Sequence, residues 1–299
     1  MKNIIKNLII NSTYIIGNLN FKVISMFNQL EILSDEQSQK LYTIRRYINN
    51  LESVCIAYSG GVDSTLVASL AFEQLGSKAI AITGISPALA TTLREEARRQ
   101  AKWIGVKHLE IKTSELDQSS YSENPKDRCF ACKQELHKHT TYLSKKLNYK
   151  IVLDGVNLDD LKDYRPGIQA SKQAGVISPL AKFKVSKQDI RDISRALGFP
   201  WWDKPAQPCL SSRFPYGHEI TSERLKMVER AEEYLKEGGL SEVRVRCQGS
   251  TARIEIPQDE LKHFFNKYNF SELVQYFSNL GFNCTSLDLE GLISGKLNR

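Results

Sequence analysis

A six-residue loop between a strand-like run and a helix-like run constrains this 299-residue chain more than any other feature. The loop follows the apolar run 53–58, precedes the helical pattern 65–71, and consists of Ser59, Gly60, Gly61, Val62, Asp63 and Ser64. Where a strand turns through two glycines into a helix, unpaired backbone N–H groups and the positive helix end converge. The glycines let a phosphate approach the main chain, and the serines add hydroxyl donors. The loop therefore predicts a pyrophosphate-binding site.

Two other phosphate motifs do not fit this loop. No Gly-Lys-Ser/Thr follows it, which excludes a Walker-type loop, and the G-x-G-x-x-G spacing of dinucleotide-binding folds is absent. An ordinary glycine turn is the alternative without a function. Asp63 fits a Mg²⁺ ligand or an organiser of the loop, and it equally fits a plain helix N-cap.

The chain from residue 53 onward alternates strand-like and helix-like segments. Strands are predicted at 53–58, 79–83, 108–112 and 151–154, with helices at 66–75, 93–104 and 134–147. This alternation predicts an α/β fold with a doubly wound parallel sheet. Ligands of such sheets bind at the carboxyl ends of the strands, where the loops 59–64, 84–86 and 155–157 fall.

The predicted domain organisation follows from changes in residue composition along the chain. Four prolines between residues 200 and 215 indicate an extended connection, and a boundary is predicted near Gly217. Beyond it, helices at 222–237, 259–266 and 271–280 and strands at 242–247, 252–256 and 285–289 predict a smaller α+β domain. The predicted division is an N-terminal extension (1–35), a nucleotide-binding domain (36–217) and a C-terminal domain (218–299).

Net charge and cysteine content indicate the cellular compartment of the protein and the kind of partner it could bind. Forty-one Lys and Arg against 34 Asp and Glu give a formal charge of +7, which suits anionic ligands or RNA and also suits a solvated surface. Six cysteines in a chain of this length do not resemble a disulfide framework, and no cleavable signal is visible, so a reducing cytoplasm is predicted. The apolar runs of the first 25 residues are shorter than the ~20 residues that a membrane helix needs.

Cysteines form the second chemical signal. Cys129 and Cys132 lie one helical turn apart, so both thiols can reach one metal or cluster. His137 and His139 follow closely, which keeps a zinc site open beside a redox pair and two ordinary helix-face thiols. Cys209 lies near Arg213, whose charge favours a reactive thiolate. The remaining three cysteines lie in strand-like runs and are expected to be buried and inert: Cys55, Cys247 and Cys284.

Two further segments suit the binding of a phosphorylated ligand. The loop 154–167 follows a strand and carries Asp160 and Arg165, although Asp and Asn also simply favour turns. Arg244 and Arg246 alternate on a strand and point to the same face. They would repel each other unless an anion, or a carboxylate such as that of Glu255, lies between them. A phosphate clamp and a solvated sheet face both remain open.

These motifs together resemble the LarE family of PP-loop, adenine nucleotide alpha hydrolase-like sulfur transferases, which help to build the nickel-pincer nucleotide cofactor. The resemblance covers roughly residues 40 to 290 and rests on 59–64, 154–167, 208–213 and 243–255. It implies that ATP adenylates a carboxylate of pyridinium-3,5-biscarboxylic acid mononucleotide, that pyrophosphate leaves, and that sulfur then attacks the activated acyl group.

The resemblance also implies roles for single residues. The loop residues from Ser59 to Ser64 would hold ATP with Mg²⁺, Cys209 would handle sulfur, and Arg244 with Arg246 would bind a substrate phosphate. Asp63 and Arg213 would assist catalysis, and Asp160 and Arg165 would contact the substrate. Some members sacrifice one cysteine, whereas others have three that look able to hold a [4Fe-4S] cluster. This chain, with Cys129, Cys132 and Cys209, is similar to the second type.

The resemblance further implies a small-molecule nucleotide substrate, no nucleic-acid or membrane partner, and a homo-oligomer, a hexamer in relatives; it leaves the sulfide donor unidentified. The main rival is a tRNA thiolase that joins a PP-loop to a three-cysteine cluster. The sequence also leaves open an ATP-dependent amidating synthetase and a non-catalytic nucleotide-binding regulator.

Overall fold

The computed structural model describes residues 10–14, 21–163, 165–293 and 295–296. It divides into two compact units, each assembled from separate stretches of the chain. The first comprises Met1–Ile85, Thr91–Thr113 and Cys132–Gln207, and the second comprises Ser86–Ala90, Ser114–Ala131 and Pro208–Arg299. The boundaries predicted at residues 35 and 217 stay predictions. Within the described ranges, no helix has the length and apolar character needed to cross a membrane.

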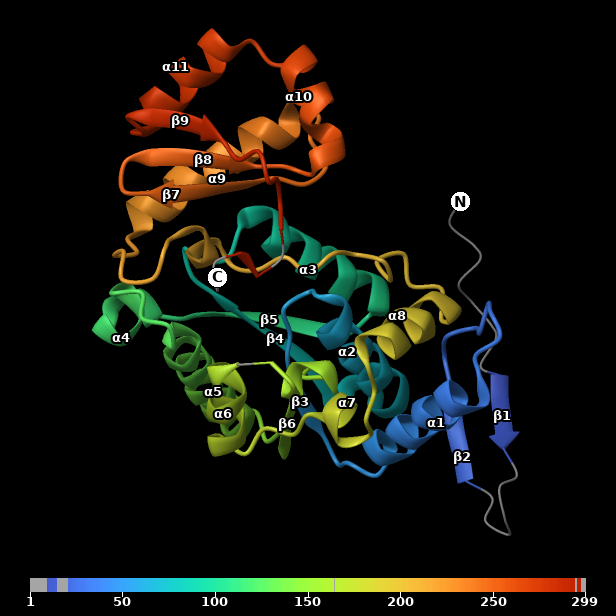
Figure 1. Ribbon diagram of the computed structural model, residues 1–299. Coiled ribbons are helices and arrows are strands. Elements are labelled where there is room, and N and C mark those ends of the chain that lie inside the picture. Colours follow the sequence, from blue (N-terminus) through green and yellow to red (C-terminus); the bar gives the residue numbers. More distant parts are fainter. Residues whose placement is uncertain (1–9, 15–20, 164, 294, 297–299) are drawn as a thin grey trace. The chain divides into compact units, whose positions relative to one another are not determined.

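The first unit is built on a parallel four-stranded sheet (Figure 1). Its strands are β3 (Val54–Ala57), β4 (Ala79–Ile85), β5 (Lys107–Lys112) and β6 (Ile151–Leu153), in the order β5-β4-β3-β6. The register pairs Val54 with both Ala79 and Ile151. A separate antiparallel hairpin, β1 (Ile10–Tyr14) with β2 (Phe21–Ser25), precedes the sheet in sequence. The predicted parallel α/β fold is confirmed.

Both faces of this sheet are covered, because successive strand residues point to opposite sides. Val54 and Ile56 join a core with residues of α1 (Asp35–Asn49), α2 (Val62–Leu75), α3 (Thr91–Ile104) and α8 (Lys187–Ala196). Cys55 points the other way and packs with Ile80, Ile82 and Leu143, the last from α5 (Arg128–Lys146). Two short helices, α6 (Pro166–Gln173) and α7 (Pro179–Lys182), follow β6. The sheet is therefore doubly wound.

The strand order reverses direction at β3, because the next strand along the chain, β4, lies on one side of it and β6 on the other. In open parallel sheets, the crevice at such a switch point is the usual ligand site. The loop Ser59–Ser64 leaves β3 and the loop 154–160 leaves β6 at the same edge. Topology alone therefore brings two of the predicted binding loops together.

The second unit has a three-stranded sheet in the order β7-β8-β9. Strands β7 (Arg244–Gln248) and β8 (Thr251–Glu255) are antiparallel, and β9 (Cys284–Leu287) runs parallel to β8. Helix α9 (Ser222–Glu237) lies against this sheet, as Figure 1 shows, and the unit also contains α4 (Ser119–Ser122), α10 (Leu261–Lys267) and α11 (Phe270–Leu280). The predicted smaller α+β region at the C-terminus is confirmed.

Candidate active site

The loop Ser59–Ser64 has the geometry of an anion site. Gly60 has a φ of +74°, which favours glycine, and a Cβ there would lie 3.0 Å from Cβ of Ala97. Gly61 is the N-cap of α2 and supplies no side-chain cap, so backbone N–H groups of the first turn remain available. The hydroxyls of Ser59 and Ser64 lie 3.1 Å apart and share a hydrogen bond. Helix end, backbone and hydroxyls thus converge on one position that suits a phosphate.

The loop after β6 lies directly against this site. A Cβ on Gly155 would come within 2.6 Å of the backbone nitrogen of Ser64, so the two main chains touch and only glycine fits. Asn157, which is fully buried, donates its side-chain amide to Oδ2 of Asp63 at 3.2 Å. Its backbone N–H donates to Oδ2 of Asp160 at 3.3 Å. Asn157 therefore links the two acidic residues across the switch point.

The surroundings of Asp63 shift the pKa of its carboxyl group. Burial raises the pKa of its carboxyl group to about 6, and the nearby Asp160 contributes in the same direction. Lys187, the hydrogen bond from Asn157, and Arg165 act against this rise. The Asp63 carboxylate is thus held close to a second carboxylate in a poorly solvated place, which is a setting that attracts a cation.

Asp160 and Arg165, both predicted to contact the substrate, form an ion pair with each other. Oδ1 of the buried Asp160 lies 3.0 Å from Nη1 of Arg165 and 3.3 Å from Nζ of Lys187. Sequence reasoning missed Lys187, the first residue of α8. The signal was present, because Ser186 and Asp189 form a capping box that marks the helix start.

A magnesium ion fits this place only with outside ligands. Asp63 and Asp160 offer carboxylate oxygens, which Mg²⁺ prefers. Within the part of the chain that the structure describes, no group of three or more His, Cys, Asp or Glu side chains could hold a metal ion. Mg²⁺ commonly binds through one or two carboxylates, substrate phosphates and water, so the two carboxylates are compatible with a nucleotide-bound ion.

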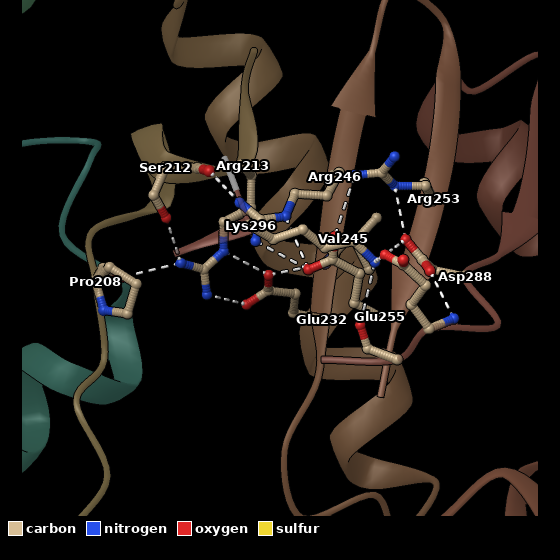
Figure 2. A network of polar contacts seen from close by, with 12 residues as sticks. Pro208, Ser212, Arg213, Glu232, Val245, Arg246, Arg253, Glu255, Asp288 and Lys296 are labelled. Atoms are coloured by element: carbon tan, nitrogen blue, oxygen red, sulfur yellow. Dashed lines mark hydrogen bonds and ion pairs between the residues drawn. The ribbon is translucent and has the colours of Figure 1, made fainter. Parts of the chain in front are cut away.

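In the second unit, Arg213 fastens the segment that carries Cys209 (Figure 2). Its Nη1 donates to the carbonyl oxygens of Pro208 and Cys209 at 2.9 and 3.3 Å. Its Nε and Nη2 form a bidentate ion pair with the carboxylate of Glu232 of α9, at 2.7 and 3.0 Å. Burial opposes the charge on Arg213, but Glu232, with smaller contributions from Cys209 and Glu255, outweighs it and raises the pKa of the guanidinium.

The two arginines of β7 share a face, as predicted, but differ in their partners. Arg246 is buried, pairs with Glu255 at 2.9 Å, and donates to the carbonyl oxygen of Ser212 at 2.6 Å (Figure 2). Arg244 is half-buried and has no hydrogen-bond or ion-pair partner among the described residues. Burial, with the charges of Arg213 and Arg246, lowers the pKa of Arg244. Of the predicted clamp, Arg244 is therefore the arginine open to an anion.

The predicted cysteine ligands lie on two segments that are tied together. Cys129 is exposed. The segment just before it is hydrogen-bonded to the segment that carries Cys209: the hydroxyls of Tyr121 and Ser211 lie 2.6 Å apart, and the side-chain amide of Asn124 donates to the carbonyl oxygen of Pro215 at 2.7 Å. Cys132, which is half-buried, lies one turn further along α5. Among the described residues, no group of three or more side chains that includes these thiols could hold a metal ion. The cluster therefore stays a prediction.

The histidines of α5 are engaged elsewhere. His137 is buried and hydrogen-bonds Ser171 at 2.8 Å, and burial, followed by the charge of Lys133, lowers its pKa to about 3. His139 contacts Glu135 at 2.8 Å. The zinc alternative therefore gains no support from these side chains.

The remaining cysteines follow their expected burial with one exception. Cys55 and Cys247 are buried, but Cys284 is exposed, so that prediction was wrong. Cys284 begins β9, which pairs with β8 on one side and is the last strand of this sheet among the described residues.

Comparison with known proteins shows the family. No protein-family model matches the chain. The chain is 53% identical over 260 residues to an uncharacterized protein of Synechocystis sp., covering 87% of this chain and 97% of the relative. It is 32% identical over 261 residues, 87% of this chain and 94% of the relative, to pyridinium-3,5-bisthiocarboxylic acid mononucleotide synthase of Lactiplantibacillus plantarum. An uncharacterized protein of Methanocaldococcus jannaschii is 34% identical over 239 residues, 80% of this chain and 90% of the relative.

The fold and the loop at its switch point define the class: an α/β protein with a PP-loop ATPase-like domain. The similarity to the synthase covers 87% of this chain and 94% of the relative. The chain therefore belongs to the LarE family, that of the pyridinium-3,5-bisthiocarboxylic acid mononucleotide synthase.

Proposed function

We propose that this protein is an ATP-dependent sulfur transferase of nickel-pincer cofactor synthesis. It adenylates a carboxylate of pyridinium-3,5-biscarboxylic acid mononucleotide, releases pyrophosphate, and inserts sulfur to give the thiocarboxylate. The observation that carries the proposal is the similarity to a synthase whose name states a bisthiocarboxylic acid mononucleotide as its product, over 87% of this chain.

The first step suits the loop Ser59–Ser64. A carboxylate oxygen of the substrate attacks the α-phosphorus of ATP, and the bond to the β-phosphate oxygen breaks, so that an acyl adenylate and pyrophosphate form. The N-terminus of α2 and the serine hydroxyls favour the negative charge that develops on the leaving pyrophosphate. Mg²⁺, carried in with ATP and held by Asp63 and Asp160, would neutralise phosphate charge.

The second step is nucleophilic acyl substitution. A sulfur nucleophile attacks the activated acyl carbon, and AMP leaves with the electrons of the broken bond to oxygen. We assign the sulfur either to Cys209 itself or to a [4Fe-4S] cluster on Cys129, Cys132 and Cys209. In the first case the Cys209 thiolate forms a thioester with the substrate; a base then removes the Cα proton, the Cβ–S bond breaks, the thiocarboxylate leaves with the sulfur, and dehydroalanine remains at position 209. In the second case the cluster would supply a sulfide. Because the described residues form no three-thiol metal group, we route no step through it.

The second unit supplies the residue for the substrate phosphate in this proposal. Arg244, half-buried and without a partner in the described part of the chain, suits the phosphate of the mononucleotide. Arg213 and Arg246 act as positioning residues, since their guanidiniums hold the backbone of residues 208–212. A homo-oligomer, and a hexamer in particular, remains a proposal based on resemblance.

The test is pyrophosphate release from ATP with the biscarboxylic acid mononucleotide as cosubstrate, coupled to mass spectrometry of the organic product. The wild type should release pyrophosphate and form a thiocarboxylate. Cys209→Ala should still release pyrophosphate but form no thiocarboxylate, because adenylation precedes sulfur delivery. Cys284→Ala is the matched control, since Cys284 is exposed and lies on β9, away from residues 208–213 in sequence and outside the proposed site. Full product formation by Cys209→Ala would refute the sulfur-handling role, and activity on tRNA alone would refute the substrate.

A further inference from the structure

The phosphate loop of this protein has no cation of its own. The loop Ser59–Ser64 contains no Lys or Arg, and neither does the helix α2 that follows it. In other phosphate loops a lysine within the motif reaches the β- and γ-phosphates. Because ATP keeps a net negative charge even with Mg²⁺ bound, we expect further cations to come from another part of the fold.

Two cations lie at the carboxylates that adjoin the loop. Lys187 places Nζ 3.3 Å from Oδ1 of Asp160, and Arg165 places Nη1 3.0 Å from the same oxygen. Asn157 links Asp160 to Asp63 of the loop, through hydrogen bonds of 3.3 and 3.2 Å. Burial raises the pKa of Asp63, and the charge of Lys187 is the largest influence that lowers it. The charge of Lys187 therefore acts directly on the loop.

The two cations are accessible, whereas the carboxylate between them is not. The side chains of Lys187 and Arg165 are 49% and 46% exposed, and that of Asp160 is 4% exposed. Arg165 also lies 3.7 Å from the exposed carboxylate of Asp163. Either cation can turn to a ligand and stay hydrated, but a buried carboxylate left without a counter-charge is strongly unfavourable. Asp160 can therefore release both cations only if another cation takes their place.

We propose that Asp160 exchanges its counter-ions when the nucleotide binds: it takes the Mg²⁺ that arrives with ATP and releases Lys187 and Arg165 to bind the pyrophosphate moiety of ATP. This inference deepens the proposed function and rests on it, since it takes ATP as the ligand of the loop. No covalent bond changes in the exchange. One consequence is positive coupling between Mg²⁺ and ATP, because each frees charges that the other needs.

Calorimetric titration of ATP and AMP with Mg²⁺ tests the role of the cations, at about pH 8, where Asp63 is ionised. Lys187→Gln should weaken ATP binding at least about tenfold, because a charge-assisted contact is lost. It should leave AMP binding unchanged, since AMP lacks the pyrophosphate moiety. Arg165→Gln should show the same pattern. Lys162→Gln is the matched control, since Lys162 is 72% exposed and pairs with Asp159 instead.

Titration of ATP in the presence of EDTA tests the exchange itself. Asp160→Asn keeps the shape of the side chain and removes its charge, so Lys187 and Arg165 are free without Mg²⁺. This variant should bind metal-free ATP about fivefold more tightly than the wild type, and Mg²⁺ should strengthen its ATP binding less. Loss of repulsion between Asp160 and ATP could also tighten binding. The double variant Asp160→Asn/Lys187→Gln separates the two causes, because only the exchange requires Lys187 for the gain.

Three results would overturn the proposal. Equal weakening of ATP and AMP binding in Lys187→Gln would mean that the lysine shapes the site without contacting the pyrophosphate moiety. Unchanged affinity of Asp160→Asn for metal-free ATP would show that the ion pairs do not hold the cations back. A gain that persists in full in the double variant would assign it to repulsion alone.

The inference and the proposed function fail separately. If ATP binding follows the expected pattern but no thiocarboxylate forms from the mononucleotide, the proposed function is wrong and the exchange stands. If thiocarboxylate forms and Lys187→Gln binds ATP as tightly as the wild type, the exchange is wrong and the function stands.

Discussion

At the scale of single residues, an arginine is open to an anion only if no carboxylate already neutralises its charge. Arg244 and Arg246 alternate on β7 and share a face, as their spacing predicts, but only Arg246 has a carboxylate partner among the described residues. The spacing cannot distinguish them, because Glu255, which lies opposite Arg244 in the register, turns its carboxylate to Arg246 and Arg253. Which arginine stays open to an anion depends on side-chain packing across the sheet.

Nucleotide binding is expected to weaken at mildly acidic pH. Burial and the neighbouring Asp160 raise the pKa of Asp63 to about 6, so its carboxylate takes up a proton as the pH falls through that value. A protonated carboxyl group is a poor Mg²⁺ ligand. The affinity for Mg²⁺ and ATP should fall by up to about tenfold for each pH unit below 6. Calorimetric titration between pH 5 and 8 measures this, with Asp63→Asn expected to give a weaker and flatter profile.

The contribution of Asp63 to stability has the opposite pH dependence. Because the folded-state pKa of Asp63 lies above the ordinary value of 3.8, its contribution to the free energy of unfolding is present below that value and is lost as the pH rises through about 6. Asp63→Asn should therefore gain stability relative to the wild type at pH 7 compared with pH 4, as measured by denaturant unfolding. Asp203→Asn, which alters an exposed carboxylate outside the site, is the control.

At the scale of elements, the site depends on how closely two strand–loop units approach each other. The loop after β3 and the loop after β6 meet through Gly155, whose missing Cβ leaves room for the backbone of Ser64. The sequence predicts both loops and the edge of the sheet at which they lie. It cannot predict the contact itself, because Gly155 has an ordinary backbone conformation and its glycine is required only by a neighbour distant in sequence.

Gly155→Ala is expected to damage the nucleotide site. The new Cβ would meet the main chain of Ser64 at 2.6 Å, and main chain cannot move aside without separating the two loops. Overpacking of this kind costs about 1–3 kcal/mol, and ATP affinity should fall by at least about tenfold. Denaturant unfolding and nucleotide titration measure the two effects.

Gly84→Ala supplies the matched comparison at the end of β4. Its new Cβ would meet Cδ1 of Leu136 at 2.9 Å, which is the far end of a flexible side chain. The cost should be below about 1 kcal/mol. If both variants bind ATP as the wild type does, the close approach of Gly155 to Ser64 is not needed for the site.

At the scale of the whole molecule, each compact unit is assembled from segments far apart in sequence. The second unit combines Ser114–Ala131 with Pro208–Arg299, so Cys129 and Cys209 belong to one unit although 80 positions separate their numbers (209 − 129). The first unit draws Phe27 and Leu33 into its main core, although both lie within the predicted N-terminal extension. Local patterns do not reveal such contacts.

Phe27→Ala is expected to destabilise the first unit. The Phe27 ring packs edge-on against Phe199 with centroids 5.1 Å apart and stacks with Trp103 at 6.1 Å. Loss of a buried phenylalanine costs about 3–5 kcal/mol. Tyr142→Ala, at a position 66% exposed in the same unit, should change stability by less than about 1 kcal/mol in denaturant unfolding. Equal stability of the two variants would mean that residues before α1 contribute nothing to the core.

The sequence by itself determined the local features of this protein. Hydrophobic periodicity predicted the four strands of the parallel sheet, the helices α2, α3 and α5, and the main helices and strands of the C-terminal region, although it missed α1 and α8. The glycines and serines of residues 59–64 predicted a phosphate loop. Each of these signals depends only on neighbouring residues. Tertiary structure alone decided which charges are neutralised. The pairing of Arg246 with Glu255 and the link from Asn157 to Asp63 both depend on segments that folding brings together. Such contacts leave no periodic trace in the chain, because packing rather than local conformation selects the partners.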